Sequence, residues 1–490
     1  MKKLFALIAT LFVAITFSGC SNIVPTGDVY NQQVDWQLCE DGVFQCAKVK
    51  VPLDWDKPEG ETIDLSVIRK FTNNSVGSLL INPGGPGGSG YDFLANSWAD
   101  IGTAALRNAY TFVSFDPRGV SRSAAVKCYD SKGTDHLLYD SNNAEPGSAE
   151  DIKLMREELK SYVEACQKNT GKVLGEIDTV SSAKDMDVIR AVLGDSKLNY
   201  LGFSYGTFLG TTYAALFPDK VGRFVLDGAI DPRVSDEQQS INQLAGFDLA
   251  LNNYLKDCVS RDSDCPFKGN RWSAQQEVKQ FLKKMETKTL PTDDGRKLTI
   301  SSATTGLIMA LYSDTYWIYL SQAFTEAFDG NGTTFIRLAD FYNDRQDNGT
   351  YKGNTLEANI AINCLDSRSS SKPEKMAAQN QKLIRLSPIL GRYWQNGALT
   401  CEQWPYPVAK RPESYAATGA PTILVVGTTG DPATPYEQSV SLAHDVLADG
   451  FLLTFKGEGH TAYGRSNVCV SDVVDNFLIE GTLPDKEPKC

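Results

Sequence analysis

The sequence predicts an α/β fold, in which a mostly parallel sheet carries helices on both faces. Short, continuous apolar runs recur along the chain, and such runs are typical of strands buried on both faces of a parallel sheet. Each run ends in a glycine-rich turn or at a polar residue, as expected where functional loops follow the carboxyl ends of the strands. The expected strands fall at 63–71, 78–81, 111–115, 200–201, 224–226, 422–426 and 451–455.

The strand pattern stops over a long stretch in the second half of the chain. Residues 232–405 are helix-like and rich in aromatic side chains. Because the strand pattern resumes afterwards, we expect a mainly helical cap inserted into the core, and not an independent second domain. The expected units are a signal peptide over 1–19, a lipid-anchored tether over 20–33, the core in two parts over 34–231 and 406–490, and the cap over 232–405.

Composition and charge narrow the class of protein. The chain has 490 residues, of which 42% are hydrophobic and 22% are charged, so it is long enough for a large globular core with an insertion. Its formal net charge is −12 and it has no basic stripe, which argues against nucleic acid as a partner. The acidic balance favours solubility and says little about the substrate.

The first twenty residues have the features of an export signal. Residues 1–3 form a short segment with two lysines, and the apolar run 4–17 is too short for a comfortable membrane span. Residues 17–20 then resemble a bacterial lipobox, in which the cysteine becomes the lipidated first residue, although Phe17 stands where leucine is usual. We therefore expect an exported protein held at the cell membrane by lipid on Cys20, the alternative being an ordinary signal peptide.

The eleven cysteines leave ten besides Cys20. An even number in an exported protein suggests disulfides, and the spacing favours pairing between neighbours in the sequence, although other connectivities stay open. The alternative, a metal cluster, is disfavoured because the chain has no C-x-x-C motif and only three histidines, so we expect no metal and no cofactor. The expected disulfides are Cys39–Cys46, Cys128–Cys166, Cys258–Cys265, Cys364–Cys401 and Cys469–Cys490.

A G-x-S-x-G motif lies at 202–206, between a short apolar run and a helix-like stretch that ends before Pro218. The motif alone also occurs by chance, but a strand, a tight turn carrying serine and a helix together form the nucleophile elbow of α/β-hydrolases. Glycines flank the serine because a side chain there would clash in so sharp a turn. The motif therefore predicts an α/β-hydrolase fold with Ser204 as the nucleophile, near a helix N-terminus that favours developing negative charge.

A serine nucleophile needs a histidine base, and the chain offers three histidines. His136 lies in a polar segment, and His444 lies in an expected surface helix. His460 follows the last expected strand and lies in a loop bracketed by glycines, which is where this fold places its histidine. We therefore expect His460 to be the base.

The acid that orients the histidine should fall between the serine and the histidine in the chain. Asp431, at the end of the penultimate expected strand, fits this position best. Asp227 and Asp231 follow an earlier strand, where some hydrolases keep the acid, and they are the alternatives. The expected triad is therefore Ser204, Asp431 and His460.

Two backbone N–H groups should stabilise the oxyanion of an acyl-transfer intermediate. One belongs to the residue after the nucleophile, Tyr205, and the other is expected in the glycine-rich loop 82–90, where Gly85 is the candidate. The loop matches neither a P-loop nor G-x-G-x-x-G, so it does not favour phosphate binding. Asp116 and Arg118 are expected to be structural residues that brace the loop beside these glycines.

Five motifs occur in a fixed order along the chain: G-G-P-G-G at 84–88, D-P-R-G at 116–119, G-x-S-Y-G-T at 202–207, G-D-x-x-T-P at 430–435 and G-H-T at 459–461. They resemble the prolyl aminopeptidase and tripeptidyl aminopeptidase branch of the α/β-hydrolases, above all the secreted, cysteine-containing tripeptidyl aminopeptidases of bacteria. The resemblance covers nearly all of the mature chain. It implies an extracytoplasmic serine exopeptidase that releases N-terminal residues from short peptides through an acyl-enzyme on Ser204. Asn82 and Pro83 stand where prolyl aminopeptidases usually have histidine, so strict proline specificity is not expected.

An aminopeptidase must also pair the ammonium group of its substrate, because burying that charge unpaired is costly. Asp366 lies in a Cys-x-Asp segment that resembles one of the family and is the candidate, the alternative being a helix cap or a surface residue. The expected partners are therefore short peptides with a free N-terminus. Two other functions stay open, namely a carboxylesterase or lipase that uses the same triad, and a non-catalytic binding protein of the cell envelope.

Overall fold

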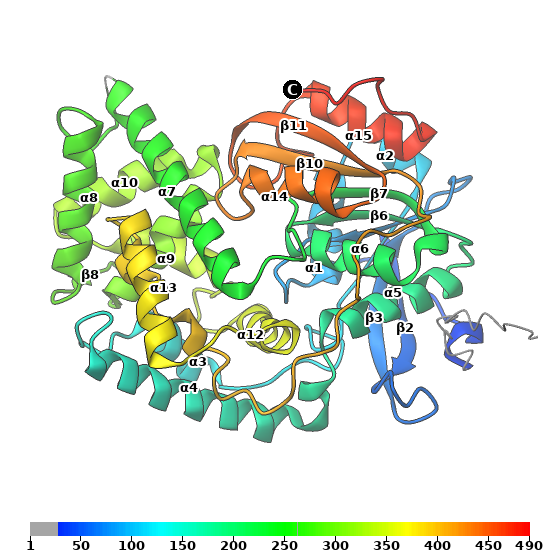
Figure 1. Ribbon diagram of the computed structural model, residues 1–490, viewed down its shortest axis with the longest axis horizontal. Coiled ribbons are helices and arrows are strands. Elements are labelled where there is room, and N and C mark those ends of the chain that lie inside the picture. The colour runs from blue at the N-terminus through cyan, green and yellow to red at the C-terminus, as the bar shows by residue number, and fades with distance from the viewer. Residues whose placement is uncertain (1–27, 262) are drawn as a thin grey trace, which may run out of the picture.

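The computed structural model describes residues 28–261 and 263–490. Within these ranges, a nine-stranded sheet has the order β1-β2-β3-β5-β4-β6-β7-β10-β11 (Figure 1). Strands β1, β2, β3 and β5 pair antiparallel, and every pair from β5 through β4 to β11 is parallel, so the sheet is mostly parallel, as predicted. The strands are β1 (Gln37–Cys39), β2 (Phe44–Pro52), β3 (Thr62–Lys70), β4 (Ser78–Asn82), β5 (Thr111–Phe115), β6 (Leu198–Phe203), β7 (Val221–Asp227), β10 (Ile423–Gly430) and β11 (Gly450–Glu458).

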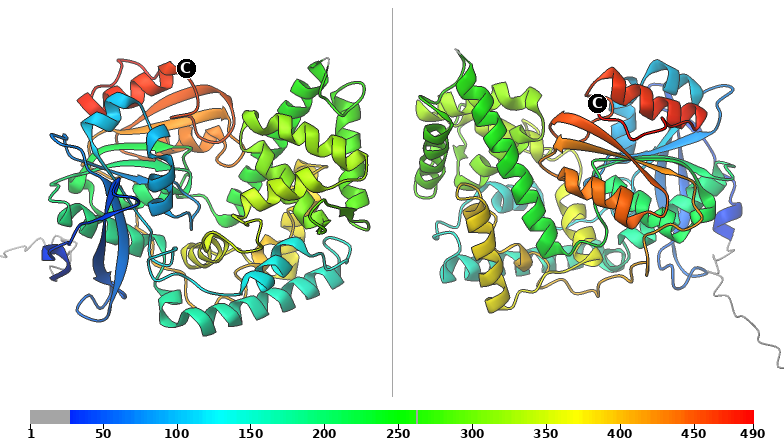
Figure 2. Two further views of the ribbon diagram at one scale, coloured as in Figure 1. Left: turned by 180° about the vertical axis from the view of Figure 1, so that it is seen from behind. Right: turned by 45° about the horizontal axis from the view of Figure 1, so that its top comes forward.

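Helices cover both faces at the centre of this sheet, which explains its continuous apolar strands. The flanking helices are α1 (Gly90–Ser97), α2 (Ala104–Ala109), α5 (Thr179–Val192), α6 (Tyr205–Leu216), α14 (Tyr436–Ser441) and α15 (Val468–Glu480). All five residues of β4 are buried, and Leu80 packs on one face with α5 and α6. Leu79 and Ile81 pack on the other face with α1, α2 and α15. Figure 2 shows the ribbon from two further sides.

A second group of helices lies to one side of the sheet (Figure 1). Its members are α3 (Ser131–Tyr139), α4 (Ala149–Thr170), α7 (Asp236–Ser260), α8 (Arg271–Met285), α9 (Ile300–Leu311), α10 (Trp317–Phe328), α11 (Thr333–Tyr342), α12 (Thr355–Asp366) and α13 (Pro373–Leu386), with a small hairpin of β8 (Leu290–Pro291) and β9 (Lys297–Leu298). Phe247, Phe281 and Phe324 belong to a hydrophobic cluster within this group, and Tyr139 of α3 joins it. Most residues of this cluster fall within 232–405, which supports the proposed cap, whereas α3 and α4 come from the expected core part 34–231 and α12 packs in the cluster of the sheet.

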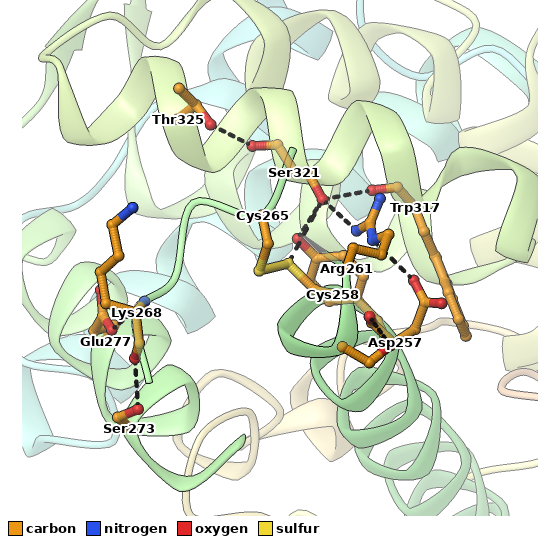
Figure 3. Close-up of a disulfide and its surroundings, with 12 residues drawn as sticks. Asp257, Cys258, Arg261, Cys265, Lys268, Ser273, Glu277, Trp317, Ser321 and Thr325 are labelled. Atoms are coloured by element: carbon orange, nitrogen blue, oxygen red, sulfur yellow. Dashed lines mark hydrogen bonds and ion pairs between the residues drawn. A yellow bond between two sulfur atoms is a disulfide. The ribbon is translucent and has the colours of Figure 1, made fainter. Parts of the chain in front are cut away.

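Five disulfides join the ten cysteines of the described ranges, and their pairing is the one expected from the sequence. Figure 3 shows Cys258–Cys265 closing the loop after α7, beside Ser321 of α10. Arg261 Nη2 donates to Ser321 Oγ at 3.0 Å, so this loop is tied to the neighbouring helix. Disulfides form and persist in oxidising compartments, and five of them are typical of a protein that works outside the cytoplasm.

The N-terminal segment is the part of the chain on which the export prediction depends. The predicted signal peptide over 1–19 and the predicted lipidation site Cys20 lie outside the described residues. Among residues 28–261 and 263–490, no helix combines the length and apolar character needed to cross a membrane. The lipid anchor therefore stays a prediction.

Candidate active site

Ser204 lies at a sharp turn between β6 and α6. Its backbone has φ 55° and ψ −124°, a strained conformation that persists only when the surrounding structure enforces it. A Cβ added to Gly202 would lie 2.5 Å from the carbonyl oxygen of Gly206, and one added to Gly206 would lie 2.9 Å from that of Asn82. Close packing therefore requires both glycines of the motif, and the turn has the form of a nucleophile elbow.

His460 follows β11 and is held by a carboxylate. Its Nδ1 lies 2.9 Å from each carboxylate oxygen of Asp431, which follows β10. Asp431 is buried, and its oxygens also accept hydrogen bonds from the backbone N–H groups of Ala433, Thr434 and Thr461. A carboxylate fixed in this way favours a proton on Nδ1 and leaves Nε2 available as a base.

Ser204 and His460 line the same cavity. Over the described ranges, the hydrogen bonds of the His460 ring go to Asp431 and Thr434 and not to the Ser204 hydroxyl, a contact that is often loose in resting enzymes and tightens when substrate binds. The other two histidines lie elsewhere, because His136 pairs with the carboxylate of Asp140, just after α3, and His444 pairs with that of Glu487, near the C-terminus. The structure therefore brings one histidine to the elbow, the one expected from the sequence.

The helical region contacts this histidine directly. The N–H of His460 donates to the carbonyl oxygen of Tyr312, which follows α9, at 2.7 Å. The two rings meet edge to face, with 5.6 Å between their centroids. The sequence places Tyr312 in an aromatic stretch but does not single it out, because the contact arises only when α9 lies beside the histidine loop. Tyr312 is thus a site residue that the sequence analysis missed.

The two alternative acids have other partners. Asp227 is buried and accepts the N–H groups of Ala462 and Tyr463 at 3.0 and 2.7 Å, so it supports the backbone of the histidine loop. Burial raises the pKa of Asp227 to about 6, although these two N–H groups oppose the shift. Asp231 pairs with Arg233 at 2.9 Å. The geometry favours Asp431 over both as the partner of the histidine.

The glycine-rich loop lies against the elbow. A Cβ on Gly84 would meet the carbonyl oxygen of Phe203 at 2.6 Å and the Cβ of Ser204 at 3.0 Å, so glycine is required for this approach. Gly85 follows at φ 116° and is exposed. Among the described residues, the N–H groups of Gly85 and Tyr205 donate to no protein acceptor, so both are available to a substrate oxygen.

Asp116 and Arg118 have separate structural roles. Asp116 accepts hydrogen bonds from the hydroxyl of Ser89 and the N–H of Arg122, so it braces one end of the glycine-rich loop. Arg118 is fully buried and forms two hydrogen bonds of 2.7 Å with the carboxylate of Asp185 on α5. Arg118 is thus a structural residue, as expected, and its guanidinium group fastens the D-P-R-G turn to α5.

Asp366 ends α12 and is buried beside the elbow residue Tyr205. Its carboxylate accepts hydrogen bonds from the N–H of Thr179, at 2.8 Å, and from the hydroxyl of Thr179. That hydroxyl also lies 2.5 Å from the Tyr205 hydroxyl, so a chain of hydrogen bonds links Asp366 to the elbow. Burial raises the pKa of Asp366 to about 7 against these hydrogen bonds. The side chain thus caps the N-terminus of α5. It also lines a cavity together with Gly85 and Tyr205.

Two cavities open beside the elbow. The cap-side cavity has a volume of about 490 Å³ and is lined by Gly85, Tyr205, Asp236 and Asp366, among others. The histidine-side cavity has a volume of about 320 Å³ and is lined by Pro83, Phe93, Ile101, Phe203, Ser204, His460 and Tyr463, with Asp100 and Arg465. The expected nucleophile and base therefore face one cavity, and the expected oxyanion donors face the other. Within the ranges that the structure describes, no group of three or more His, Cys, Asp or Glu side chains is arranged to hold a metal ion.

The chain is similar to several known hydrolases over nearly its whole length. Residues 387–490 match a family model described as TAP-like protein. Serine protease Hip1 of Mycobacterium tuberculosis is 35% identical over 507 residues, which cover 98% of this chain and 96% of that protein. Carboxylesterase B of the same species is 36% identical, covering 95% and 91%. Tripeptidyl aminopeptidase of Streptomyces coelicolor is 31% identical, covering 93% and 84%.

Proposed function

The chain belongs to the TAP-like serine hydrolases of the α/β-hydrolase fold, and from this membership we propose that it is an extracytoplasmic serine exopeptidase. Its substrates are short peptides with a free N-terminus, from which it releases di- or tripeptides, or single residues including proline. The observation that carries the proposal is the pair of 2.9 Å contacts between His460 Nδ1 and Asp431, beside a strained serine that faces the same cavity as the imidazole.

The chemistry follows from the roles proposed for these residues. Ser204 Oγ attacks the carbonyl carbon of the scissile bond while His460 Nε2 takes the hydroxyl proton, and Asp431 stabilises the imidazolium that forms. The N–H groups of Gly85 and Tyr205 stabilise the oxyanion. The C–N bond then breaks, and the imidazolium gives its proton to the leaving amine. Water, activated by the same histidine, hydrolyses the acyl-enzyme and regenerates Ser204.

We propose that Asp366 pairs the substrate ammonium. It lines the cap-side cavity, and each of its carboxylate oxygens retains acceptor capacity beyond the hydrogen bond from Thr179. Asp236 lines the same cavity and accepts a hydrogen bond from Ser367, the residue after Asp366, so two carboxylates gather at this end. A cation placed there would be paired, which offsets its loss of hydration.

A panel of chromogenic arylamides tests the proposal. Each substrate carries one, two or three residues, with its N-terminus either free or acetylated. We expect kcat/KM to be at least about tenfold higher for the free forms, and we expect Asp366→Asn to reduce that ratio. Ser204→Ala should lower kcat on the order of 10⁶-fold. Equal cleavage of free and acetylated substrates would contradict exopeptidase action.

A second candidate function is ester hydrolysis, because Carboxylesterase B is 36% identical over most of the chain. The same nucleophile and base would cleave esters, whose leaving groups depart more readily than amines. Simple p-nitrophenyl acyl esters without an amino group distinguish the two functions. An esterase would hydrolyse them with a higher kcat/KM than any free peptidyl arylamide, whereas an exopeptidase would favour the arylamides.

We also propose that lipid on Cys20 anchors the mature protein at the cell membrane. The support is the lipobox-like segment 17–20 and the participation of the ten other cysteines in disulfides. Each CH₂ group of an acyl chain that is buried in the membrane contributes about 0.8 kcal/mol to the free energy of binding. Stable anchoring therefore takes more than one chain. Mass spectrometry of the mature N-terminus, compared with a Cys20→Ser variant, tests this. A mature chain that begins at a residue other than Cys20 and carries no lipid would contradict the proposal.

A further inference from the structure

The histidine-side cavity is lined by Ser204 and His460, whereas Asp366, proposed to pair the substrate ammonium, lines the cap-side cavity. Resting on the proposed exopeptidase function, we propose that the histidine-side cavity is a specificity pocket for the first residue of the leaving peptide, and that it selects an apolar side chain such as leucine or phenylalanine.

The side on which the leaving group lies follows from the chemistry. The histidine that takes the serine proton must later give a proton to the leaving nitrogen, so that nitrogen lies next to the imidazole. Ser204 and His460 both line the histidine-side cavity. The oxyanion candidates Gly85 and Tyr205 instead line the cap-side cavity, together with the acids proposed to pair the substrate ammonium. A substrate spanning the two cavities therefore places its N-terminal part in the cap-side cavity and its leaving part in the other.

The wall of the histidine-side cavity is mainly hydrocarbon. Phe93 on α1 and Phe203, next to the nucleophile, are half-buried and pack edge to face with 6.2 Å between ring centroids. Pro83 and Ile101 extend the apolar wall. The polar atom of Tyr463 is already paired, because its hydroxyl donates to Asp475. An apolar side chain in this cavity loses contact with water and meets aromatic faces.

The charges at the cavity oppose one another. Asp100 and Arg465 both line the cavity and are both exposed, and their side chains are of opposite charge. The guanidinium group of Arg465 is engaged by the backbone, since Nε donates to the carbonyl oxygen of His460 at 2.9 Å and Nη2 to that of Glu458 at 2.8 Å. One acidic and one basic residue among the lining residues favour neither charge in a side chain that enters, so we expect hydrophobic burial to decide the preference of the pocket.

Peptide amides that differ only in the first leaving residue test this inference. The N-terminal part is held constant, the variable residue is leucine, phenylalanine, glycine or aspartate, and kcat/KM is measured by mass spectrometry. Leucine and phenylalanine should exceed glycine and aspartate by about tenfold or more. Phe93→Ala should reduce the leucine-to-glycine ratio several-fold, and Phe93→Leu should restore part of it. Phe341→Ala, at a phenylalanine of α11 that is 63% exposed, should leave the ratio unchanged.

A second readout isolates the cavity from the first half of the reaction. The acyl-enzyme is formed from a peptidyl ester, and leucinamide or glycinamide competes with water to accept the acyl group. Because the amine must occupy the leaving side, leucinamide should be the better acceptor by about tenfold, and Phe93→Ala should reduce this advantage. Ratios within one variant are independent of the folded fraction.

The outcomes separate this inference from the proposed function. Peptide cleavage with equal rates for leucine and glycine, or a ratio that Phe93→Ala does not change, would overturn the pocket assignment alone. Absence of cleavage of every free peptide would overturn the exopeptidase function. The peptidyl ester would still form an acyl-enzyme for the aminolysis measurement in that case, and equal acceptance of the two amides would then overturn the pocket as well.

Discussion

The carbonyl oxygen of Tyr312 accepts a 2.7 Å hydrogen bond from the backbone N–H of His460. Tyr312 belongs to the helical region and His460 to the loop after β11, so this bond joins the two parts of the molecule at the expected catalytic base. The edge-to-face contact of the rings adds a second constraint on the imidazole. The position of the base therefore depends on how the helical region is seated.

Removing the Tyr312 ring should impair catalysis without abolishing it. Tyr312→Ala keeps the backbone hydrogen bond but removes the ring contact, so the imidazole gains freedom, and kcat should fall by about tenfold. Tyr312→Phe keeps the ring and should retain most of the activity. Steady-state kinetics on a peptidyl arylamide measure both variants, and equal kcat values for Tyr312→Ala and wild type would show that the ring does not position the base.

Replacing Asp431 should disable the base while preserving the fold. Asp431→Asn keeps the volume but presents an amide to Nδ1, which favours the wrong tautomer of His460, so kcat should fall by about 10⁴-fold. Asp219→Asn is a matched control at an exposed site and should leave kcat unchanged. Circular dichroism verifies folding. If Asp431→Asn retained more than about a tenth of the activity, another acid would orient the histidine.

Asp366 should make stability depend on pH. Burial, with a smaller contribution from Asp178, raises its pKa to about 7 in the folded protein, although Thr179 and Arg411 act to lower it. An aspartate in the unfolded chain has a pKa of about 4. The folded state therefore binds more protons between about pH 4 and pH 7, and the contribution of Asp366 to stability falls as pH rises through this window, by about 1.4 kcal/mol per unit. Asp366→Asn removes this dependence.

Urea unfolding of wild type and Asp366→Asn at pH 5 and pH 7 measures this effect. The free energy of unfolding of the wild type, minus that of the variant, should be smaller at pH 7 than at pH 5. A difference that is constant with pH would mean that the carboxyl group titrates with an ordinary pKa in the folded protein.

The disulfides should differ in their contribution to stability. Cys364–Cys401 joins residues 37 apart, whereas Cys39–Cys46 joins residues 7 apart. The longer loop loses more conformational entropy on closure in the unfolded chain, so paired Cys→Ala replacement should cost about 4 kcal/mol for the first and about 2.5 kcal/mol for the second. Denaturant unfolding of both double variants checks the order, and a larger loss for the shorter loop would contradict the entropic explanation.

Much of the core was predictable because its signals are local. The runs 78–81 and 111–115 match β4 and β5 closely, since strands covered on both faces have continuous apolar sequences. β1 and most of β2 were not predicted. They pair antiparallel at one edge of the sheet, where β2 mixes buried, half-buried and exposed residues and therefore lacks a continuous apolar run.

The sequence by itself determined the local chemistry of the site. The order of serine, aspartate and histidine along the chain, the glycines around Ser204 and the neighbouring cysteine pairs follow from short segments, in which turn geometry and spacing restrict the residues allowed. Only the tertiary structure decided the partners across long sequence distances: Arg118 with Asp185, Asp366 with Thr179, and Tyr312 with His460. The two cavities on either side of the elbow also arise only in three dimensions, because their walls come from strands, loops and helices that no local pattern relates.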